Sequence, residues 1–182
     1  MLIRKSTYED IESLLAIFTY ARQQMIADGN PMQWGDGYPK REVLEDDIER
    51  GVSYVLEQDG ELYGTFVFVL GDDPTYAHIE DGEWLVPTLP YGTIHRIASN
   101  GRRKGIFHRV LAWCSERCNN IRIDTHADNQ RMIHLIEHSG FIRCGIIYTR
   151  NHSPRIAYKK SQEYTSENFL KVTKLHFFIR LL

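Results

Sequence analysis

The stretch Asn100-Gly101-Arg102-Arg103-Lys104-Gly105-Ile106-Phe107 joins a predicted strand over residues 92–98 to a predicted helix over residues 106–117. The start of a helix leaves backbone N–H groups without partners, and the helix dipole favours anions there. Three cationic side chains precede this helix start, and Gly105 lets the backbone approach a ligand with no Cβ atom in the way. The stretch therefore predicts a phosphate-binding turn. The alternative is a basic loop that only caps a surface helix.

The chain on either side of this turn predicts further helices and strands. A strand begins at Ile3, and a first helix opens at a Ser6–Glu9 capping box and carries an apolar stripe from Ile11 to Met25. Asp59-Gly60 favours a hairpin turn. The other predicted elements are a helix over 40–50, strands over 53–57, 62–70 and 121–124, a helix over 129–138, and strands over 141–148 and 155–159.

Helices alternate with strands only in the second half of this order, which indicates an α/β fold of the mixed α+β kind. We expect a mixed central sheet of about six to seven strands with helices on both faces. Residues 1–160 form one predicted domain. Residues 161–182 form a C-terminal extension, and its apolar end at 175–182 suggests either poor order or an interface, for example in a homodimer.

Composition narrows the class of protein. The chain has 182 residues, 42% of them apolar and 25% charged, as in an ordinary globular domain. Its net charge of −2 gives no global field that would gather nucleic acid or an acidic membrane. We find no long apolar run and no signal-peptide core, and the three cysteines lack C-x-x-C spacing. These features predict a cytoplasmic protein with reduced core thiols.

A second block supports a ligand at the same place. Residues 121–129 are followed by Met132, Ile136 and Gly140-Phe141, and this spacing resembles the N-x-x-A/M-x-x-x-Y-x-x-x-G-F segment of the GNAT superfamily of N-acetyltransferases. Arg102-x-x-Gly105-x-Phe107 likewise resembles the superfamily's pyrophosphate loop, Q/R-x-x-G-x-G/A. Phe107 replaces the usual Gly or Ala, and Ile136 replaces a frequent Tyr.

The resemblance implies a GNAT-like acyl-CoA N-acyltransferase fold that uses acetyl-coenzyme A as co-substrate and a primary amine as acceptor. It implies that the two strands over 92–98 and 121–124 part, and that the pantetheine arm enters the gap and bonds the backbone like an added strand. The implied cofactor-binding residues are Arg102, Arg103, Lys104, Gly105, Ile106 and Phe107 at the pyrophosphate, with Ile97, Ala98 and Asn129 along the pantetheine.

Acetyl transfer needs a neutral amine, because an ammonium ion has no lone pair. His95 is the leading candidate for the base, since histidine ordinarily titrates near neutrality and His95 lies on the cofactor strand. A purely structural strand histidine is the alternative. Glu80, Asp81 and His126 are weaker candidates. With Ile136 at the usual Tyr position, either Tyr148 donates the proton or no acid is needed, because a thiol pKa of about 8.5 makes coenzyme A a tolerable leaving group.

Acceptor recognition is expected from two irregular segments that carry aromatic and acidic side chains. Trp34 and Tyr38 lie in the first, and Tyr76 and Trp84 lie in the second, which is rich in carboxylates. Aromatic faces beside carboxylates attract a cationic amine. The alternative is that Trp34 and Trp84 are core or dimer contacts.

Two other functions fit parts of the sequence. His134-Leu135-Ile136-Glu137-His138 matches the H-x-x-E-H motif of a zinc peptidase, but no well-placed third ligand follows, since Glu163 and Glu167 lie in the poorly patterned extension. We therefore expect no metal. The departures at Phe107 and Ile136 also fit a coenzyme A sensor that has this fold and does not turn over.

Overall fold

The computed structural model describes residues 1–35, 37–85 and 88–161. The elements are β1 (Leu2–Lys5), η1 (Tyr8–Asp10), α1 (Ile11–Ala27), α2 (Arg41–Glu49), β2 (Ser53–Gln58), β3 (Glu61–Leu70), η2 (Pro74–Tyr76), β4 (Gly92–Ser99), α3 (Ile106–Ser115), β5 (Asn120–Thr125), α4 (Gln130–His138), β6 (Ile142–Tyr148) and β7 (Pro154–Ser161). The predicted helices and strands are therefore confirmed in order, with small shifts at their ends. The predicted extension lies outside the described residues from residue 162 onward.

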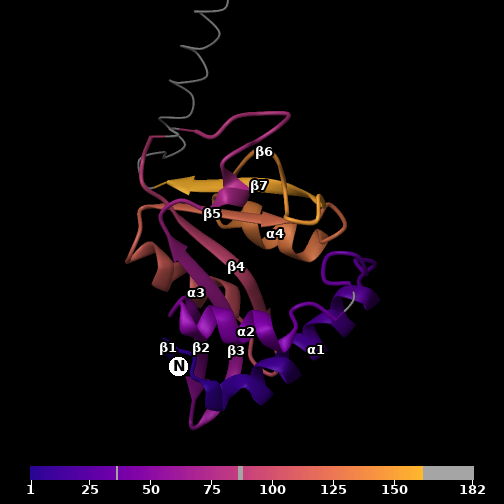
Figure 1. Cartoon of the computed structure of the whole chain (residues 1–182), viewed down its shortest axis with the longest axis vertical. Coiled ribbons are helices and arrows are strands. Elements are labelled where there is room, and N and C mark those ends of the chain that lie inside the picture. The colour runs from indigo at the N-terminus through magenta and orange to yellow at the C-terminus, as the bar shows by residue number, and fades with distance from the viewer. Residues whose placement is uncertain (36, 86–87, 162–182) are drawn as a thin grey trace, which may run out of the picture.

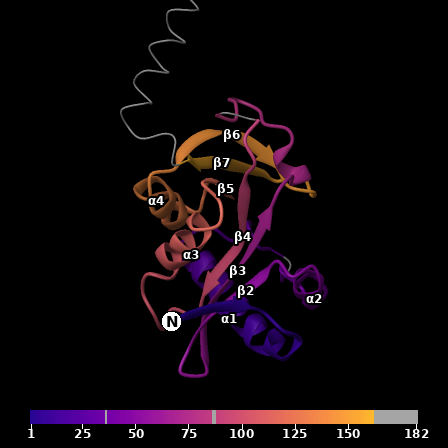
Figure 2. The same cartoon turned by 90° about the vertical axis from the view of Figure 1, so that its left-hand side faces the viewer.

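The strands form one seven-stranded sheet in the order β1-β2-β3-β4-β5-β7-β6. Neighbouring strands are antiparallel except for the central pair, β4 and β5, which is parallel. Helices α1 and α2 lie on one side of the sheet, and α3 and α4 lie on the other (Figures 1 and 2). This arrangement confirms the predicted mixed α/β fold with helices on both faces.

The central strands β4 and β5 pair over a short segment and then separate. Strand β4 pairs with β5 only from Gly92 to Ile94, although β4 continues to Ser99. A bulge in β4 accompanies the separation: Val67 pairs with His95 and Thr65 with Ala98, so β4 has one more residue than β3 in this interval. Arg96 within the bulge has φ 49°, and an extra residue of this kind bends a strand. Figure 1 shows β5 running across the direction of β4.

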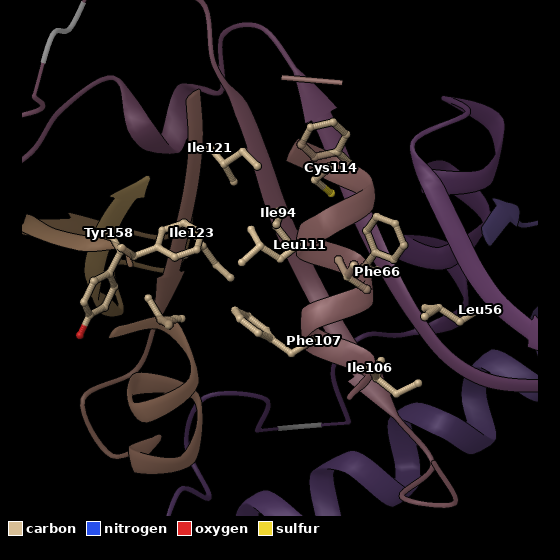
Figure 3. Close-up of a cluster of buried hydrophobic side chains, with 14 of the residues drawn as sticks. Leu56, Phe66, Ile94, Ile106, Phe107, Leu111, Cys114, Ile121, Ile123 and Tyr158 are labelled. Carbon is tan, nitrogen blue, oxygen red and sulfur yellow. The ribbon is translucent and has the colours of Figure 1, made fainter. Parts of the chain in front are cut away.

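The larger core lies between the sheet and the α3–α4 layer. Val110 and Cys114 of α3 are fully buried there, together with Ile136 of α4. Figure 3 shows Ile94 of β4 and Ile123 of β5 facing this core, and Phe107 pointing from α3 toward β5. A second core packs α1 against the other face of β2 and β4. On the α3–α4 side of the sheet, a packed core therefore lies beside the point where β4 and β5 separate.

The first helix begins differently from the prediction. Thr7 N–H donates to Asp10 Oδ2 at 2.8 Å, so the capping box is Thr7–Asp10, whereas the sequence suggested Ser6–Glu9. Ser6 is instead buried and shares a 2.8 Å hydrogen bond with Ser53 of β2. Sheet contact at Ser6 thus moves the helix start by one residue. Across the described residues, no helix has the length and apolar character needed to cross a membrane.

Candidate active site

The turn between β4 and α3 has the geometry of an anion site. Gly105 is the N-cap of α3 with φ 76°. Within the part of the chain that the structure describes, no side chain caps this helix, and a Cβ atom built on Gly105 meets nothing within 4 Å. The first N–H groups of α3 therefore remain available. Asn100 shapes the turn, because its Nδ2 donates to the Leu62 carbonyl at 2.9 Å and its Oδ1 accepts from Arg102 N–H at 3.1 Å.

The cationic side chains of the turn are exposed around this helix start. Arg102 donates to Glu61 Oε2 at 2.9 Å, and its guanidinium lies 5.6 Å from the Tyr63 ring centroid. The Arg103 guanidinium lies 5.0 Å from the same centroid, and Lys104 is exposed. Exposed ion pairs of this kind are weak. Arg102 can therefore exchange Glu61 for a phosphate at little cost.

Two of the other predicted cofactor residues lie on β4 where the strands have parted. Ile97 and Ala98 follow Ile94 on β4, where β5 no longer pairs, so their backbone borders the place at which the strands separate. Ala98 is buried, and Ile97 is partly buried against the larger core. Ile106 and Phe107 have buried side chains, which leaves their backbone N–H groups as their contribution to the turn.

Asn129 lies on the opposite side of the parting, at the start of α4. Its Oδ1 accepts from Met132 N–H at 3.1 Å, and its Nδ2 donates to Gln33 Oε1 at 2.9 Å. The same Gln33 oxygen lies 3.4 Å from both Thr125 Oγ1 and His126 N. The sequence did not identify Gln33. It ties the loop after α1 to the β5–α4 connection, next to a predicted pantetheine contact.

Comparison with known proteins identifies the family of the chain. The model of the acetyltransferase (GNAT) family matches residues 19–141. The chain belongs to the GNAT acetyltransferase family. None of the curated protein sequences matches it.

Solved structures of GNAT proteins overlay most of the chain. A GNAT-family acetyltransferase from Streptococcus agalactiae is 30% identical, with 90% of this chain and 96% of that one covered at a TM-score of 0.77. One from Listeria monocytogenes is 18% identical, with 88% and 94% covered at 0.64. A ribosomal-protein-alanine N-acetyltransferase from Brucella melitensis is also 18% identical, with 88% and 99% covered at 0.55. The latter two show a shared fold.

His95 of this GNAT protein lies between two carboxylates. Its Nε2 is 2.7 Å from Asp73 Oδ2, and its Nδ1 is 4.0 Å from Asp124 Oδ1. Burial opposes ionisation of Asp73, but hydrogen bonds from His95 and Thr75 outweigh it and hold the pKa of Asp73 well below its usual range. Asp73 is therefore an ionised orienting group for the imidazole, which the sequence did not pair with His95.

Two of the four predicted acceptor residues are core residues, which corrects that part of the prediction. Tyr76 is 1% exposed and Trp84 8% exposed, and their rings stack on each other at 5.5 Å. The Arg122 guanidinium covers the Trp84 ring at 4.0 Å. The faces of both rings are thus occupied within the protein. Tyr76 instead donates to Asp124 Oδ1 at 2.5 Å and so fixes that carboxylate.

The other two predicted acceptor residues are half-buried side chains of the loop after α1. Trp34 is partly buried and packs edge-on against Phe18 with 5.5 Å between ring centroids. Tyr38 accepts from Arg96 through its hydroxyl at 2.9 Å. Trp34 also lines a small cavity of about 220 Å³ between the loop and the end of α1. The loop after α1 thus connects to the β4 bulge through Arg96.

Arg96 also donates to Asp47 Oδ1 at 2.6 Å, and the Asp47 side chain is only 2% exposed. We expect Asp47→Ala to lower the free energy of unfolding by about 3 kcal/mol or more, because it leaves a largely buried guanidinium without its charged partner. Denaturant unfolding measures this loss. Asp46→Ala is the matched control, since its pair with Arg50 is exposed and contributes about 0.5 kcal/mol. Equal losses of unfolding free energy in Asp47→Ala and Asp46→Ala would contradict a stabilising role of the buried Arg96–Asp47 ion pair.

Tyr148 is separated from His95 by the sheet. It lies on the edge strand β6, and β5 and β7 lie between β6 and β4, a distance of about 14 Å at normal strand spacing. Its hydroxyl donates to Glu80 Oε2 at 3.1 Å, and this bond raises the pKa of the phenol. A raised pKa weakens a proton donor. The arrangement favours the alternative in which coenzyme A leaves without a protein acid.

The weaker base candidates lie elsewhere. Glu80 and Asp81 are exposed, and the backbone of Glu80 bonds Ile146 of β6 in both directions at 2.8 Å. His126 Nδ1 accepts from Asp128 N–H at 3.2 Å in the β5–α4 turn. The exposed Asp128 carboxylate also lies 3.3 Å from that same His126 nitrogen, whereas Asp73, the carboxylate beside His95, is largely buried.

The H-x-x-E-H segment forms part of α4 and has structural partners. Glu137 accepts from the Tyr158 hydroxyl at 3.0 Å, and the rings of His134 and His138 lie against each other with centroids 3.8 Å apart and an interplanar angle of 34°. His138 Nδ1 is bonded to the His134 carbonyl at 2.9 Å. These bonds direct the glutamate to the sheet and occupy one histidine nitrogen, as in an ordinary surface helix.

Proposed function

We propose that this GNAT protein transfers an acetyl group from acetyl-coenzyme A to a primary amine, by direct attack in a ternary complex. The observation that carries the proposal is the parting of β4 and β5 after Ile94, beside an uncapped helix start with three cations. Backbone groups of β4 are available to the pantetheine there, and the N–H groups of α3 are available to the pyrophosphate.

The bonds formed and broken in the proposed transfer, and the proton that is removed, can be followed step by step. The amine nitrogen attacks the thioester carbon, the carbon–sulfur bond breaks, and coenzyme A leaves as a thiolate. His95 removes the proton from the attacking nitrogen, with Asp73 holding the imidazole in place at 2.7 Å. A backbone N–H of β4 at the parting steadies the negative charge that develops on the carbonyl oxygen.

The test is release of coenzyme A thiol from acetyl-coenzyme A over a panel of amines, combined with calorimetric binding of coenzyme A. We expect binding and amine-dependent thiol release. Absence of binding would contradict the proposal. The panel should include a polyamine, amino acids, an aminoglycoside and a peptide with a free N-terminus, because all of these present a primary amine.

Two of the protein's three thiols should interfere little with this assay. Cys114 and Cys144 are buried, and burial raises the pKa of both thiols. We expect both to react slowly with a disulfide reagent at neutral pH in the native protein and rapidly after unfolding, because the thiolate is the reactive form. Counting modified cysteines by mass spectrometry before and after denaturant checks this. Rapid native labelling of Cys114 would contradict it.

A coenzyme A sensor without turnover is the second candidate. It is favoured by the buried Phe107 in the first turn of α3 and by the fully buried Ile136, which has no hydroxyl to donate. Thermal stabilisation by acetyl-coenzyme A, without thiol release for any amine in the panel, would favour the sensor over the enzyme.

A further inference from the structure

His95 and Asp124 occupy matching positions on the two strands that part. Ile94 and Ile123 are the last residues to pair, and His95 and Asp124 directly follow them. Ile94 and Ile123 face the core on the α3–α4 side (Figure 3). Because side chains alternate along a strand, His95 and Asp124 face the other side, beside η2. They therefore flank the point at which β4 and β5 separate, on the face of the sheet opposite α3.

His95 and Asp124 each place a polar atom near the other across the parting. His95 Nδ1 and Asp124 Oδ1 are 4.0 Å apart, which is too long for a hydrogen bond. The other ring nitrogen is held by Asp73 at 2.7 Å, and Asp73 is itself held by Thr75. The neutral tautomer with its proton on Nε2 satisfies Asp73 and leaves the lone pair of Nδ1 directed toward Asp124. A nitrogen atom at about 2.8 Å from both atoms fits this geometry.

Among residues 1–35, 37–85 and 88–161, no charged group lies within hydrogen-bond distance of Asp124. Its Oδ1 accepts from the neutral Tyr76 hydroxyl at 2.5 Å, and the nearest cationic nitrogen, Arg155 Nε, is 3.9 Å from Oδ2. The terminal nitrogens of Arg155 are engaged elsewhere, by Ser153, the Pro154 carbonyl and the Gln33 carbonyl. A largely buried carboxylate of this kind favours a cationic ligand.

The side chains remain accessible to a small group. The exposed fractions are 18% for His95, 15% for Asp124 and 14% for Asp73. Resting on the proposed function, we infer that the acceptor amine binds as an ammonium ion between Asp124 and His95. Asp124 holds the cation, and His95 Nδ1 takes one proton from it. The proton passes from His95 to solvent, and the neutral nitrogen attacks the thioester carbon across the parted strands. The carbon–sulfur bond breaks, coenzyme A leaves as a thiolate, and the attacking nitrogen loses its second proton through His95 to solvent, which leaves the neutral amide. The acceptor class is therefore a basic aliphatic amine.

The test compares two acceptors in Asp124→Asn, which keeps an oxygen for the Tyr76 hydroxyl and removes the charge. One acceptor is the best alkylamine of the panel, which is an ammonium ion at neutral pH. The other is hydroxylamine, which is largely neutral there. We expect KM for the alkylamine to rise about tenfold or more, from the loss of a charge-assisted hydrogen bond, with KM for hydroxylamine and for acetyl-coenzyme A little changed. Asp72→Asn is the control, because it removes an equal charge from an exposed neighbouring position.

Equal effects on the two acceptors, or an unchanged KM for the alkylamine, would overturn the inference and indicate that Asp124 only supports the fold. Calorimetric binding of ethylammonium in the presence of coenzyme A separates this result from a failure of the proposed function. If the wild type binds ethylammonium and Asp124→Asn does not, the ammonium site is upheld even without turnover. No binding by the wild type would overturn it. Thiol release decides the activity separately.

Discussion

Gly105→Glu should raise the KM for acetyl-coenzyme A by about hundredfold or more, because it places a negative charge where several charge-assisted hydrogen bonds to the pyrophosphate are expected. The structure allows the side chain itself, since a Cβ atom at Gly105 meets none of the described residues within 4 Å. The backbone is less tolerant: φ is 76°, and a non-glycine residue in this region costs about 1–2 kcal/mol. The variant should therefore fold with reduced stability and lose cofactor affinity. Calorimetric binding of coenzyme A measures this directly.

Two further variants separate charge from backbone strain. Gly105→Ala imposes the same φ penalty without charge, and we expect it to retain most of the affinity. Gly71→Glu introduces the same side chain at another glycine with positive φ, 94°, and open surroundings. Because Leu70 pairs with Gly92, Gly71 lies at the opposite end of β4 from the turn. Normal coenzyme A binding by Gly105→Glu would show that the β4–α3 turn is not the pyrophosphate site.

The sequence alone was enough to predict the features that depend on a few neighbouring residues. The β4–α3 turn is specified by Gly105 and the apolar periodicity of α3, and the β2–β3 hairpin by Asp59-Gly60, both of which have positive φ. Asn129 was correctly placed at the start of α4, where its side chain accepts from Met132 N–H. Backbone conformation and capping depend on a few neighbouring residues, so a single sequence can reveal them.

Features that depend on distant pairing could not be predicted in this way. Strand β7 inserts between β5 and β6, so the last hairpin folds back on the sheet, and no spacing along the chain specifies this. The irregular segment after η2 pairs with β6 through Glu80 and Ile146. Gly82 and Gly145 permit that close approach, because a Cβ atom on either would lie within 3 Å of the other segment's backbone. In the sequence, Gly82 and Gly145 were the residues from which this close approach could have been inferred.

The site shows the same division between local and distant causes. His95 could be chosen from its residue type and its strand, but Asp73 is 22 positions earlier and Asp124 lies on another strand. Tyr76 and Trp84 were predicted to contact an acceptor because both are aromatic and lie near carboxylates. Their burial depends on packing against Arg122 and Cys144, which the linear pattern does not contain.

His95→Gln should lower kcat by about hundredfold or more at neutral pH, the usual contribution of a general base. The glutamine amide can still donate to Asp73, so the orienting contact is kept while the basic lone pair is lost. KM for acetyl-coenzyme A should change little, because the pyrophosphate turn lies beyond the other end of the parted segment, after Ser99. The deficit should shrink as pH rises toward the amine pKa of about 10.4, since free amine then forms without the protein.

His134→Gln is the matched control for this experiment, because it makes the same substitution at an exposed histidine of α4. A general base predicts that only the His95 variant loses kcat and that its loss depends on pH. A structural histidine predicts a loss of thermal stability with a pH-independent rate ratio, since packing does not supply a proton acceptor. Unchanged turnover of His95→Gln between about pH 6 and pH 9 would remove His95 from the mechanism. Deprotonation of the amine would then depend on Asp124 or on solvent, with Asp73 and His95 serving only to hold η2 against β4.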